Sequence, residues 1–492
     1  MNKVLLVVII QILFFSFLFS QTEPDSLWFN TYGGENFDSA FSVTQTSDAN
    51  YVFVGSTDSF GNGYSDIYLV KTDENGNELW SKTFGGIDHD GAGSVAETTD
   101  SGLILFGGTN SFGVEQSALY LIKTDSNGDS LWTQVINLPD YDYARFNYGI
   151  QISDGGYVIV GNGIPETSTA DDIFLLKTDE NGNLLWTRNI GGSINDSWDL
   201  GKCVQQTNDN GFIIAGSTGA PDQSPGNVYL IKTNALGNTL WTKQFNGNGN
   251  SHGNYIQQTN DSGFIITGYV EYYGVTSDIY LIRTNGIGDT LWTSKIGGQS
   301  DCMGFCVKQT TDEGFVVAGS IHDWCSDETY KAYILKTNSY GDSMWSQSYG
   351  CDLAVANSII TTDEDEYIIA GNTNSYSSPL QTDAFLLKLG YETSAENIIN
   401  TSNLSAVNYP NPFNPTTTIE FSIQNDSEVK LIIFNIKGQI IKTLINKSLN
   451  IGDYSESWDG VDDSGKSVGS GVYLYQIKTP SKILTKRMML LK

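Results

Sequence analysis

Histidine, cysteine and charged residues are scarce in this sequence. It has three His and five Cys among 492 residues, and only 17% of its residues are charged. Neither the HExxH pattern of zinc proteases nor the CxxC pattern of thiol oxidoreductases occurs. We therefore expect no cofactor and no metal site, although a Ser/His/Asp arrangement assembled from distant residues stays open.

Long hydrophobic runs are also absent, except at the start of the chain. Val4 to Phe19 is almost entirely apolar, follows the basic Lys3 and precedes the small Ser20. This pattern indicates a secretory signal peptide over residues 1–20. No later stretch reaches the ~18 apolar residues that a membrane helix needs. We expect a mature chain without a transmembrane segment that is secreted or held at the outer cell surface.

Basic residues are few relative to acidic ones. The chain has 26 Lys and Arg against 56 Asp and Glu, a formal net charge of −30. Residues 401–492 carry 10 basic and 8 acidic residues, so the acidic excess lies before residue 401. A surface of this sign repels phosphate backbones, and we expect no nucleic-acid partner. The charge is otherwise typical of a soluble exported protein.

Glycine and aromatic residues, by contrast, are abundant, with 52 Gly, 26 Tyr, 23 Phe and 10 Trp. Many turn formers and aromatics together favour all-β structure. A unit typified by residues 65–86 (SDIYLVKTDENGNELWSKTFGG) recurs along the chain. Its Leu-Trp or Met-Trp step returns at intervals of 52, 52, 54, 55, 51 and 53 residues, at Trp28, Trp80, Trp132, Trp186, Trp241, Trp292 and Trp345. A fixed period near fifty indicates a repeat architecture.

Each repeat contains four strand signals, which the first repeat shows at residues 41–46, 51–55, 66–72 and around Trp80. The second strand is a continuous Ile/Val run in most copies, and this is typical of a strand buried on both faces. A single four-stranded sheet cannot bury both of its faces, so neighbouring sheets must stack on it. Radial stacking of such sheets predicts a seven-bladed β-propeller over residues 21–391.

The last repeat, residues 351–390, has no Leu-Trp strand, whereas a spare copy lies at residues 25–34. We predict that the spare strand completes the last blade and closes the ring, which leaves no open sheet edge. The repeated Trp is expected to pack neighbouring blades together. A ring of Trp that stacks on a ligand is the alternative.

The repeats resemble those of β-propellers in secreted bacterial proteins, through the runs GG…D…V…D-G-[FY]-[VI]-x-[AT]-G and D-x-[FY]-L-x-K-T-[DN]-x-x-G-x-x-x-W. They resemble Kelch-type blades more distantly. The resemblance implies a scaffold, and such scaffolds host many functions.

A polar, Gly-free stretch at residues 392–406 breaks the repeat and is interpreted as a linker. A proline-rich segment follows, made of Pro410, Asn411, Pro412, Phe413, Asn414 and Pro415. Six or seven short alternating strands then predict a small immunoglobulin-like sandwich over residues 407–492.

This tail is similar to the C-terminal sorting domain (type A) of proteins exported by the type IX secretion system. The matching runs are NYPNPFNPTTTIEFSI (408–423), FNIKGQIIKTLIN (434–446), YSESWDGVDDSGKSVGSGVYLYQI (454–477) and TKRMMLLK (485–492). The resemblance implies recognition of the tail by the type IX machinery at the outer membrane, after which cargo is released or attached to the surface. An ordinary sandwich module is the alternative.

Irregular sequence gathers in the connections from fourth to first strands and from second to third strands, which share one face of a propeller. Aligned on the strand that follows, Asp38, Asp90 and Asp199 occupy one register, and Trp198 and Asp301 lie in the same set of loops. These residues are candidates for binding a cation or sugar hydroxyls, or for acid/base chemistry. Loop capping by Asp is the alternative.

The cysteines fall into two groups. Cys302, Cys325 and Cys351 lie in loops expected on this face, and we predict one disulfide that joins Cys325 to Cys302 or Cys351. Cys203 and Cys306 share one position of the first strand and are expected to be buried thiols.

These patterns favour an exported, non-enzymatic propeller that binds a polysaccharide or a protein partner with its loop face. An extracellular carbohydrate-active enzyme, a hydrolase or lyase that uses carboxylates of the loop face, is the second hypothesis. A purely structural surface protein is the third.

Overall fold

The computed structural model describes residues 23–490, apart from 115–116, 167, 191–197, 220–225, 273–275, 299, 323–328, 351–352, 363–364, 375–380, 392–404, 410, 412, 424–425, 436–438 and 480–482. The chain divides into two compact units, one up to Tyr391 and one from Glu392 onward. The proposed signal peptide and most of the proposed linker lie outside the described residues.

The described residues of the first unit form seven four-stranded antiparallel sheets. The first strands are β2 (Asp38–Gln45), β6 (Asp90–Glu97), β10 (Tyr141–Gln151), β14 (Trp198–Gln206), β18 (Asn250–Gln258), β22 (Asp301–Gln309) and β26 (Ala354–Thr361). The second are β3 (Tyr51–Thr57), β7 (Leu103–Thr109), β11 (Tyr157–Pro165), β15 (Phe212–Gly219), β19 (Phe264–Glu271), β23 (Phe315–His322) and β27 (Tyr367–Thr373). The third are β4 (Asp66–Thr72), β8 (Ala118–Thr124), β12 (Asp172–Thr178), β16 (Asn227–Thr233), β20 (Ser277–Thr284), β24 (Tyr330–Thr337) and β28 (Asp383–Gly390). The fourth are β5 (Glu78–Phe84), β9 (Ser130–Ile136), β13 (Leu184–Ile190), β17 (Thr239–Phe245), β21 (Thr290–Ile296), β25 (Ser343–Tyr349) and, in the last sheet, β1 (Asp25–Tyr32).

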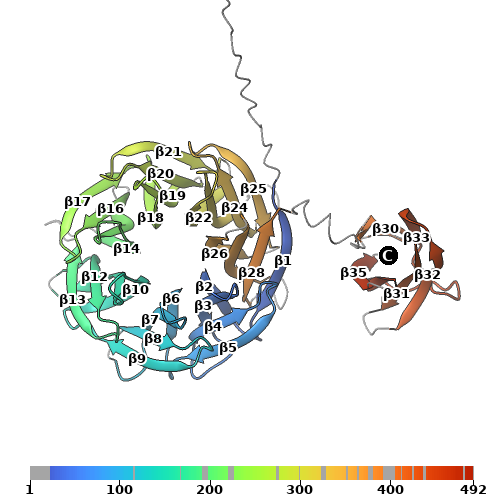
Figure 1. Ribbon diagram of the computed structural model, residues 1–492, viewed down its shortest axis with the longest axis horizontal. Coiled ribbons are helices and arrows are strands. Elements are labelled where there is room, and N and C mark those ends of the chain that lie inside the picture. Colours follow the sequence, from blue (N-terminus) through green and yellow to red (C-terminus); the bar gives the residue numbers. More distant parts are fainter. Residues whose placement is uncertain are drawn as a thin grey trace, which may run out of the picture. The chain divides into compact units, whose positions relative to one another are not determined.

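The sheets succeed one another around a common axis, with first strands innermost and fourth strands outermost (Figure 1). This β-propeller-like arrangement follows from the apolar second and third strands. In β3, residues Tyr51 to Gly55 are all buried, and in β4 every residue is buried. Both faces of the central strands are therefore covered by the neighbouring sheets, as their continuous apolar runs predict.

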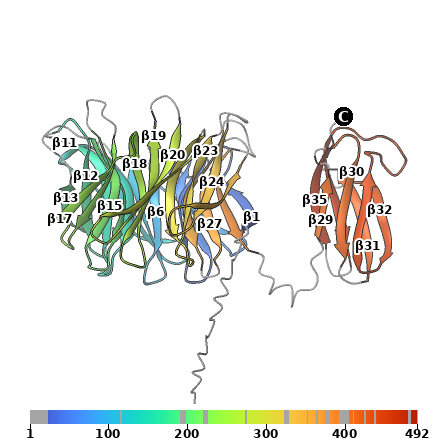
Figure 2. The ribbon, with the colours of Figure 1, turned by 90° about the horizontal axis from the view of Figure 1, so that it is seen from above.

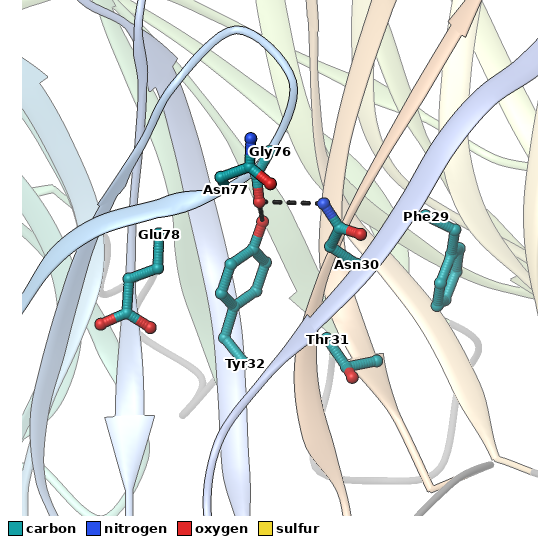
Figure 3. Close-up of a pocket in the computed structure, with 7 residues that line it drawn as sticks. All are labelled: Phe29, Asn30, Thr31, Tyr32, Gly76, Asn77 and Glu78. Atoms are coloured by element: carbon teal, nitrogen blue, oxygen red, sulfur yellow. Dashed lines mark hydrogen bonds between the residues drawn. The ribbon is translucent and has the colours of Figure 1, made fainter. Parts of the chain in front are cut away.

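The predicted pairing of the N-terminal strand with the last repeat is confirmed. β1 pairs antiparallel with β28, with Thr31 opposite Phe385. The rings of Phe29 and Phe385 stack with centroids 5.0 Å apart. On its other side, β1 reaches the first sheet, because Tyr32 Oη and Asn30 Nδ2 both donate to the carbonyl of Gly76, at 2.6 and 2.9 Å (Figure 3). β1 thus links the last sheet to the first, beside an open groove of about 600 Å³.

The repeated Trp packs neighbouring sheets together, as predicted. Trp132 of the second sheet lies with its ring centroid 6.1 Å from that of Tyr157 in the third, and Trp292 lies 5.8 Å from Phe315 of the next sheet. Trp28 makes the same contact with Tyr51 at 6.2 Å. Six of the seven repeated Trp residues, all except Trp345, also cover a turn Gly of the next sheet, where a Cβ would collide with the indole, as at Gly341 (φ +83°) beneath Trp292. The repeated Trp residues therefore stabilise the contacts between neighbouring sheets.

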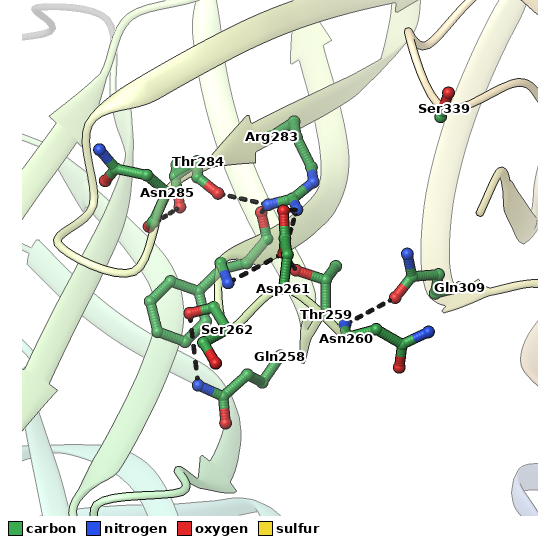
Figure 4. Close-up of polar contacts among 12 residues, drawn as sticks. Gln258, Thr259, Asn260, Asp261, Ser262, Arg283, Thr284, Asn285, Gln309 and Ser339 are labelled. Carbon is green, nitrogen blue, oxygen red and sulfur yellow. Dashed lines mark hydrogen bonds and ion pairs between the residues drawn. The ribbon is translucent and has the colours of Figure 1, made fainter.

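An ion pair repeats in every sheet and fixes the first hairpin to the third strand. A nearly buried Lys or Arg near the end of the third strand reaches an acidic residue of the turn between the first and second strands. The pairs are Lys71–Asp48, Lys123–Asp100, Lys177–Asp154, Lys232–Asp209, Arg283–Asp261, Lys336–Asp312 and Lys388–Glu366. Figure 4 shows the fifth of them, where Arg283 also donates to the carbonyl of Thr284. Across the seam, the Asn260 amide donates to Gln309 Oε1 of the next sheet at 3.0 Å.

The second unit contains two sheets. One has the order β29 (Ser405–Tyr409), β30 (Thr417–Ile423), β33 (Gly452–Trp458), and the other has the order β32 (Ile440–Leu449), β31 (Ser427–Asn435), β34 (Gly471–Lys478), β35 (Ile483–Leu490). Trp458 is fully buried in their common core and lies with its ring centroid 5.6 Å from that of Phe413. The predicted sandwich of short strands is therefore present.

Candidate ligand-binding face

The loops that join fourth to first strands and second to third strands lie at one end of the sheets, as their antiparallel order requires (Figure 2). Backbone hydrogen bonds tie these loops to one another: the Asp90 amide donates to Ser65 O at 2.8 Å, and the Asn110 amide donates to His89 O at 2.9 Å. We call this end the loop face.

The three Asp residues aligned in the sequence lie beneath the loop face. Asp38 has a relative exposure of 0%, and Asp90 and Asp199 are also buried. Asp38 Oδ2 accepts from the Gly34 amide at 2.8 Å and from Ser59 Oγ at 2.6 Å. Asp90 repeats this with the Gly86 amide and Ser111 Oγ, at 2.7 and 2.8 Å. Asp38 and Asp90 therefore cap the surrounding loops, and ligand contact through the three Asp residues stays a prediction.

The residue before each of these aligned positions faces outward, because side chains alternate along a strand. Trp198 directly precedes Asp199 and is 57% exposed. The corresponding positions of all seven sheets form what we call the rim row: Phe37, His89, Tyr143, Trp198, Asn250, Asp301 and Leu353. Phe37, Tyr143 and Leu353 are exposed as well. Four members of the rim row, Phe37, Tyr143, Trp198 and Leu353, therefore present large apolar or aromatic side chains to solvent around the inner end of the loop face.

Asp301, the other predicted residue, belongs to this row together with Trp198. It is half-buried, its Oδ1 accepts from the Ser277 amide at 2.7 Å, and its Oδ2 lies 3.9 Å from Nδ1 of His322. Further aromatic residues, Phe60, Tyr64 and Phe112, are exposed in the loops after β3 and β7. The structure thus brings Trp198 and Asp301 into one row and places the other three predicted residues behind it.

Each of the three His residues of the chain stacks on a Tyr. The ring centroids are 5.1 Å apart for His89 and Tyr64, 4.6 Å for His252 and Tyr269, and 4.4 Å for His322 and Tyr330. Ser65 Oγ lies 3.0 Å from His89 Nδ1. Among the described residues no carboxylate is hydrogen-bonded to His89, so this contact lacks the orienting acid of a catalytic triad.

Two sequence patterns look catalytic but lie in strands and hairpins. G-x-S-x-G occurs at residues 249–253, where Ser251 is buried and its hydroxyl bonds to the backbone of Gly247 and Gly249. The P-loop pattern occurs at residues 460–467, between β33 and β34. A nucleophile elbow and a P-loop both need a following helix, and strands follow here.

Two buried carboxylates meet at the seam between the first and second sheets. A Cβ added to Gly85 would lie 1.7 Å from Asp66 Oδ1 and 2.7 Å from Asp90 Oδ2. Asp66 Oδ1 and Asp90 Oδ1 have no hydrogen-bond partner among the described residues. Burial raises the pKa of Asp66, and the charge of Asp90 adds to this, although the Asn62 amide that donates to Asp66 opposes it. The ionised form of Asp66 is therefore costly in the folded protein.

We expect Asp66→Asn to stabilise the protein near pH 7, by about 1 kcal/mol, because it removes one of two adjacent buried charges. Asn227 occupies the equivalent position opposite Thr218 in the fourth sheet. The pKa of Asp66 is higher in the folded than in the unfolded protein. Its ionised carboxylate therefore destabilises the fold above the folded-state pKa, and this destabilisation is relieved as the pH falls toward the unfolded-state pKa. The gain should therefore shrink as the pH approaches about 4, as urea denaturation across this range would measure.

Asp100→Asn is the control of opposite sign. The Thr98 hydroxyl and the buried Lys123 hold the pKa of Asp100 at about 2, so its charge stabilises the fold at neutral pH. Two variants that shift stability in the same direction near pH 7 would contradict this interpretation of the seam.

The buried-thiol prediction is confirmed for Cys203 and Cys306, whose Sγ atoms lie 3.9 and 3.6 Å from the carbonyls of Ile256 and Ile359. The expectation that Cys302 lies in a loop is wrong, because it is a buried residue of strand β22. Cys325 and Cys351 lie outside the described residues, so the disulfide stays a prediction.

In the proline-rich segment of the second unit, Phe413 is buried and its amide donates to Met489 O at 2.9 Å. Asn411 Oδ1 accepts from the Met489 amide at the same distance. Asn414 and Pro415 are exposed, and Pro410 and Pro412 lie outside the described residues. The segment is thus fixed to the last strand of the sandwich.

Two further observations concern metals and membranes. Within the described ranges, no three or more His, Cys, Asp or Glu side chains are grouped so as to hold a metal ion. The same ranges contain no helical segment with the length and hydropathy needed to cross a bilayer.

Comparison with known proteins gives one family match. The model of the FlgD Ig-like domain matches residues 411–482. Among curated proteins, no significant sequence match is found.

Several solved structures are similar at low identity. PorZ, a bacterial surface component of the type-IX secretion system of Porphyromonas gingivalis, is 10% identical, with 94% of this chain and 100% of that chain covered and a TM-score of 0.27. A PL25 ulvan lyase is 11% identical over 73% of this chain and 96% of that chain, with a TM-score of 0.49. The α-L-arabinofuranosidase arb93a from Fusarium graminearum is 9% identical over 73% and 94%, with a TM-score of 0.39. The chain contains a β-propeller-like set of seven sheets, and its C-terminal unit contains the segment that matches the FlgD Ig-like domain.

Proposed function

We propose that this protein is an exported scaffold that binds an extracellular polysaccharide with its loop face. In this proposal the seven sheets form a closed seven-bladed propeller. The pairing of β1 with β28 and the contact of Tyr32 and Asn30 with Gly76 support closure, because they join the two ends of the series of sheets.

The rim row is the observation that carries the binding proposal. Trp198, Tyr143 and Phe37 expose aromatic surface at equivalent positions of different sheets. Aromatic side chains that are exposed together and rimmed by polar groups are typical of binding surfaces. Behind Phe37, the buried Asp38 holds the supporting loop through the Gly34 amide and Ser59 Oγ.

A glycan array probed with the mature chain tests the proposal. Trp198→Ala combined with Tyr143→Ala should weaken binding at least tenfold. Tyr340→Ala is the matched control, because Tyr340 is an aromatic residue of 76% exposure in the turn between β24 and β25, at the opposite end of the sheets. Equal losses in the two variants, or binding to no glycan, would overturn the proposal.

The second hypothesis is a hydrolase or lyase that acts on the same polysaccharide. The half-buried Asp301 beside His322 is the acidic group of the rim row that supports it. Incubation of any bound glycan with the protein separates the two hypotheses: release of shorter products that Asp301→Asn abolishes would favour the enzyme.

For export, we propose delivery by the type IX secretion machinery through the C-terminal domain. The four matching runs between residues 408 and 492 and the sandwich fold of this unit support this. Removal of residues 407–492 should leave the protein in the periplasm. Unchanged arrival of the truncated chain at the surface or in the medium would refute this route.

A further inference from the structure

Basic side chains gather on the inner strands of the third, fourth and fifth sheets, in a protein with a net charge of −30. They are Arg145 on β10, Lys202 on β14 and His252 on β18. Arg145 and His252 hold the same position of the repeat, where the other sheets have Ser39, Gly91, Leu200, Met303 and Val355. The other sheets thus have a small or apolar residue at this position, whereas the third and fifth sheets, on either side of β14, have a basic one.

Lys202 stands between them on an irregularity of its strand. The register of β14 against β15 shifts between Gly201 and Cys203, as it does at the equivalent position of the other six first strands, so Lys202 is the extra residue of a bulge. A bulge redirects the side chain of its extra residue. Burial and then the Arg145 charge lower the pKa of Lys202, whereas Asp171 opposes them. The strands that carry Arg145 and Lys202 lie side by side, since Asn147 Nδ2 of β10 donates to Gly201 O of β14 at 2.6 Å.

Lys202 also lacks the partner that other half-buried cations of this unit have. Lys308, for example, donates to Tyr255 Oη at 2.7 Å. Lys202 makes neither a hydrogen bond nor an ion pair with any described residue. Holding a partly desolvated ammonium without an anion is costly, and an anionic ligand would offset this cost.

Arg145 and His252 are held in place by neighbouring aromatic residues. Arg145 Nε donates to Tyr143 Oη at 2.7 Å, and the guanidinium lies 5.2 Å from the centre of the Tyr143 ring. His252 stacks on Tyr269, and its Nε2 lies 2.9 Å from Asn250 Nδ2. Tyr143 and Asn250 are themselves members of the rim row, so the basic residues adjoin the proposed binding surface.

Two carboxylates lie at the edge of this group. Asp171 Oδ1 accepts from Asn162 Nδ2 at 2.7 Å. Burial lowers the pKa of His252, and the negative charge of the nearby Glu271 opposes this. Neither forms an ion pair with Arg145 or Lys202 among the described residues. Asp171 and Glu271 can therefore accept hydrogen bonds from sugar hydroxyls, while Arg145 and Lys202 bind an acidic group of the same ligand.

We propose that Lys202 and Arg145 bind the carboxylate or sulfate group of an acidic sugar, with Trp198 and Tyr143 against the sugar ring. This inference rests on the proposed polysaccharide binding and names its class of ligand. The ligand is a polysaccharide that bears acidic groups, and neutral glycans bind more weakly.

The test uses the mature chain on an array of carboxylated, sulfated and neutral glycans, followed by calorimetry in 0.15 M salt. The best-bound polymer is compared with its methyl-esterified or desulfated form, which keeps the sugar backbone and loses the charge. We expect at least tenfold weaker binding of the neutral form. We also expect Lys202→Met to weaken binding of the acidic form at least tenfold and to leave binding of the neutral form unchanged.

Lys202→Arg keeps the charge and should retain most of the affinity, and matching thermal unfolding of the three proteins checks that the fold is intact. Preference for neutral glycans, or full affinity in Lys202→Met, overturns the acidic-sugar inference and leaves polysaccharide binding standing. Absence of binding to any glycan overturns both.

Discussion

Deletion of residues 21–34 is expected to destabilise the first unit more than any single substitution. The deletion removes β1, exposes the edge of β28 and abolishes the contacts of Trp28 with Tyr51 and of Phe29 with Phe385. From the apolar area of these aromatic side chains alone we expect a loss of about 5 kcal/mol or more, together with aggregation through the open edge. Thermal unfolding by circular dichroism and size-exclusion chromatography would measure both effects.

A synthetic peptide of residues 21–34 added to the deleted protein should restore much of the lost stability, because the strand joins the sheet without needing the covalent connection. Removal of residues 392–492 is the control, since it takes away a separate compact unit and leaves every sheet of the first unit intact. A deleted protein that unfolds at the temperature of the intact one would contradict the assigned role of β1.

Asp312→Ala is expected to have the largest effect among the repeated ion pairs. The side chain of Lys336 is only 1% exposed, and its Nζ lies 2.9 and 2.8 Å from the two carboxylate oxygens of Asp312. Removal of Asp312 leaves a buried ammonium without its anion, which costs about 3–5 kcal/mol in comparable pairs. Urea denaturation near pH 7 would measure the change in the free energy of unfolding.

Asp129→Ala is the matched control, because Asp129 pairs with Lys82 between sheets where both side chains are exposed. Exposed pairs contribute at most about 1 kcal/mol. The double variant Lys336→Met with Asp312→Ala should recover much of the loss, since no buried charge then remains. A loss in Asp312→Ala no greater than that in Asp129→Ala would mean that Lys336 finds water or another anion.

The repeat made most of the fold predictable. The spacing of Trp80, Trp132 and Trp186 gave the period, and the missing Leu-Trp strand after β28 pointed to β1. The repeated ion pair was also visible in principle, because Asp48 and Lys71 are 23 residues apart, and so are Asp100 and Lys123. Across the seven pairs the spacing stays between 22 and 24 residues, and such a nearly regular spacing of opposite charges is a sequence signal of the ion pair.

The candidate site was less predictable because it depends on which way each side chain points. Alignment of the first strands selected Asp38, Asp90 and Asp199, and a shift of one residue separates these buried positions from the exposed rim row. Lys202 was missed for a related reason. Its side chain is directed by a bulge that recurs at the same position of all seven first strands, and the strand pattern alone does not reveal that bulge.

Amide hydrogen exchange of residues 21–492, resolved at β1 and β28, tests the central claim most directly. We predict that amides of residues 25–32 exchange as slowly as those of fourth strands such as β9 and β13, because they are paired in the same way with a third strand. Exchange of residues 25–32 at the rate of an unpaired segment, with fast exchange along β28, would contradict a ring completed by its N-terminal strand.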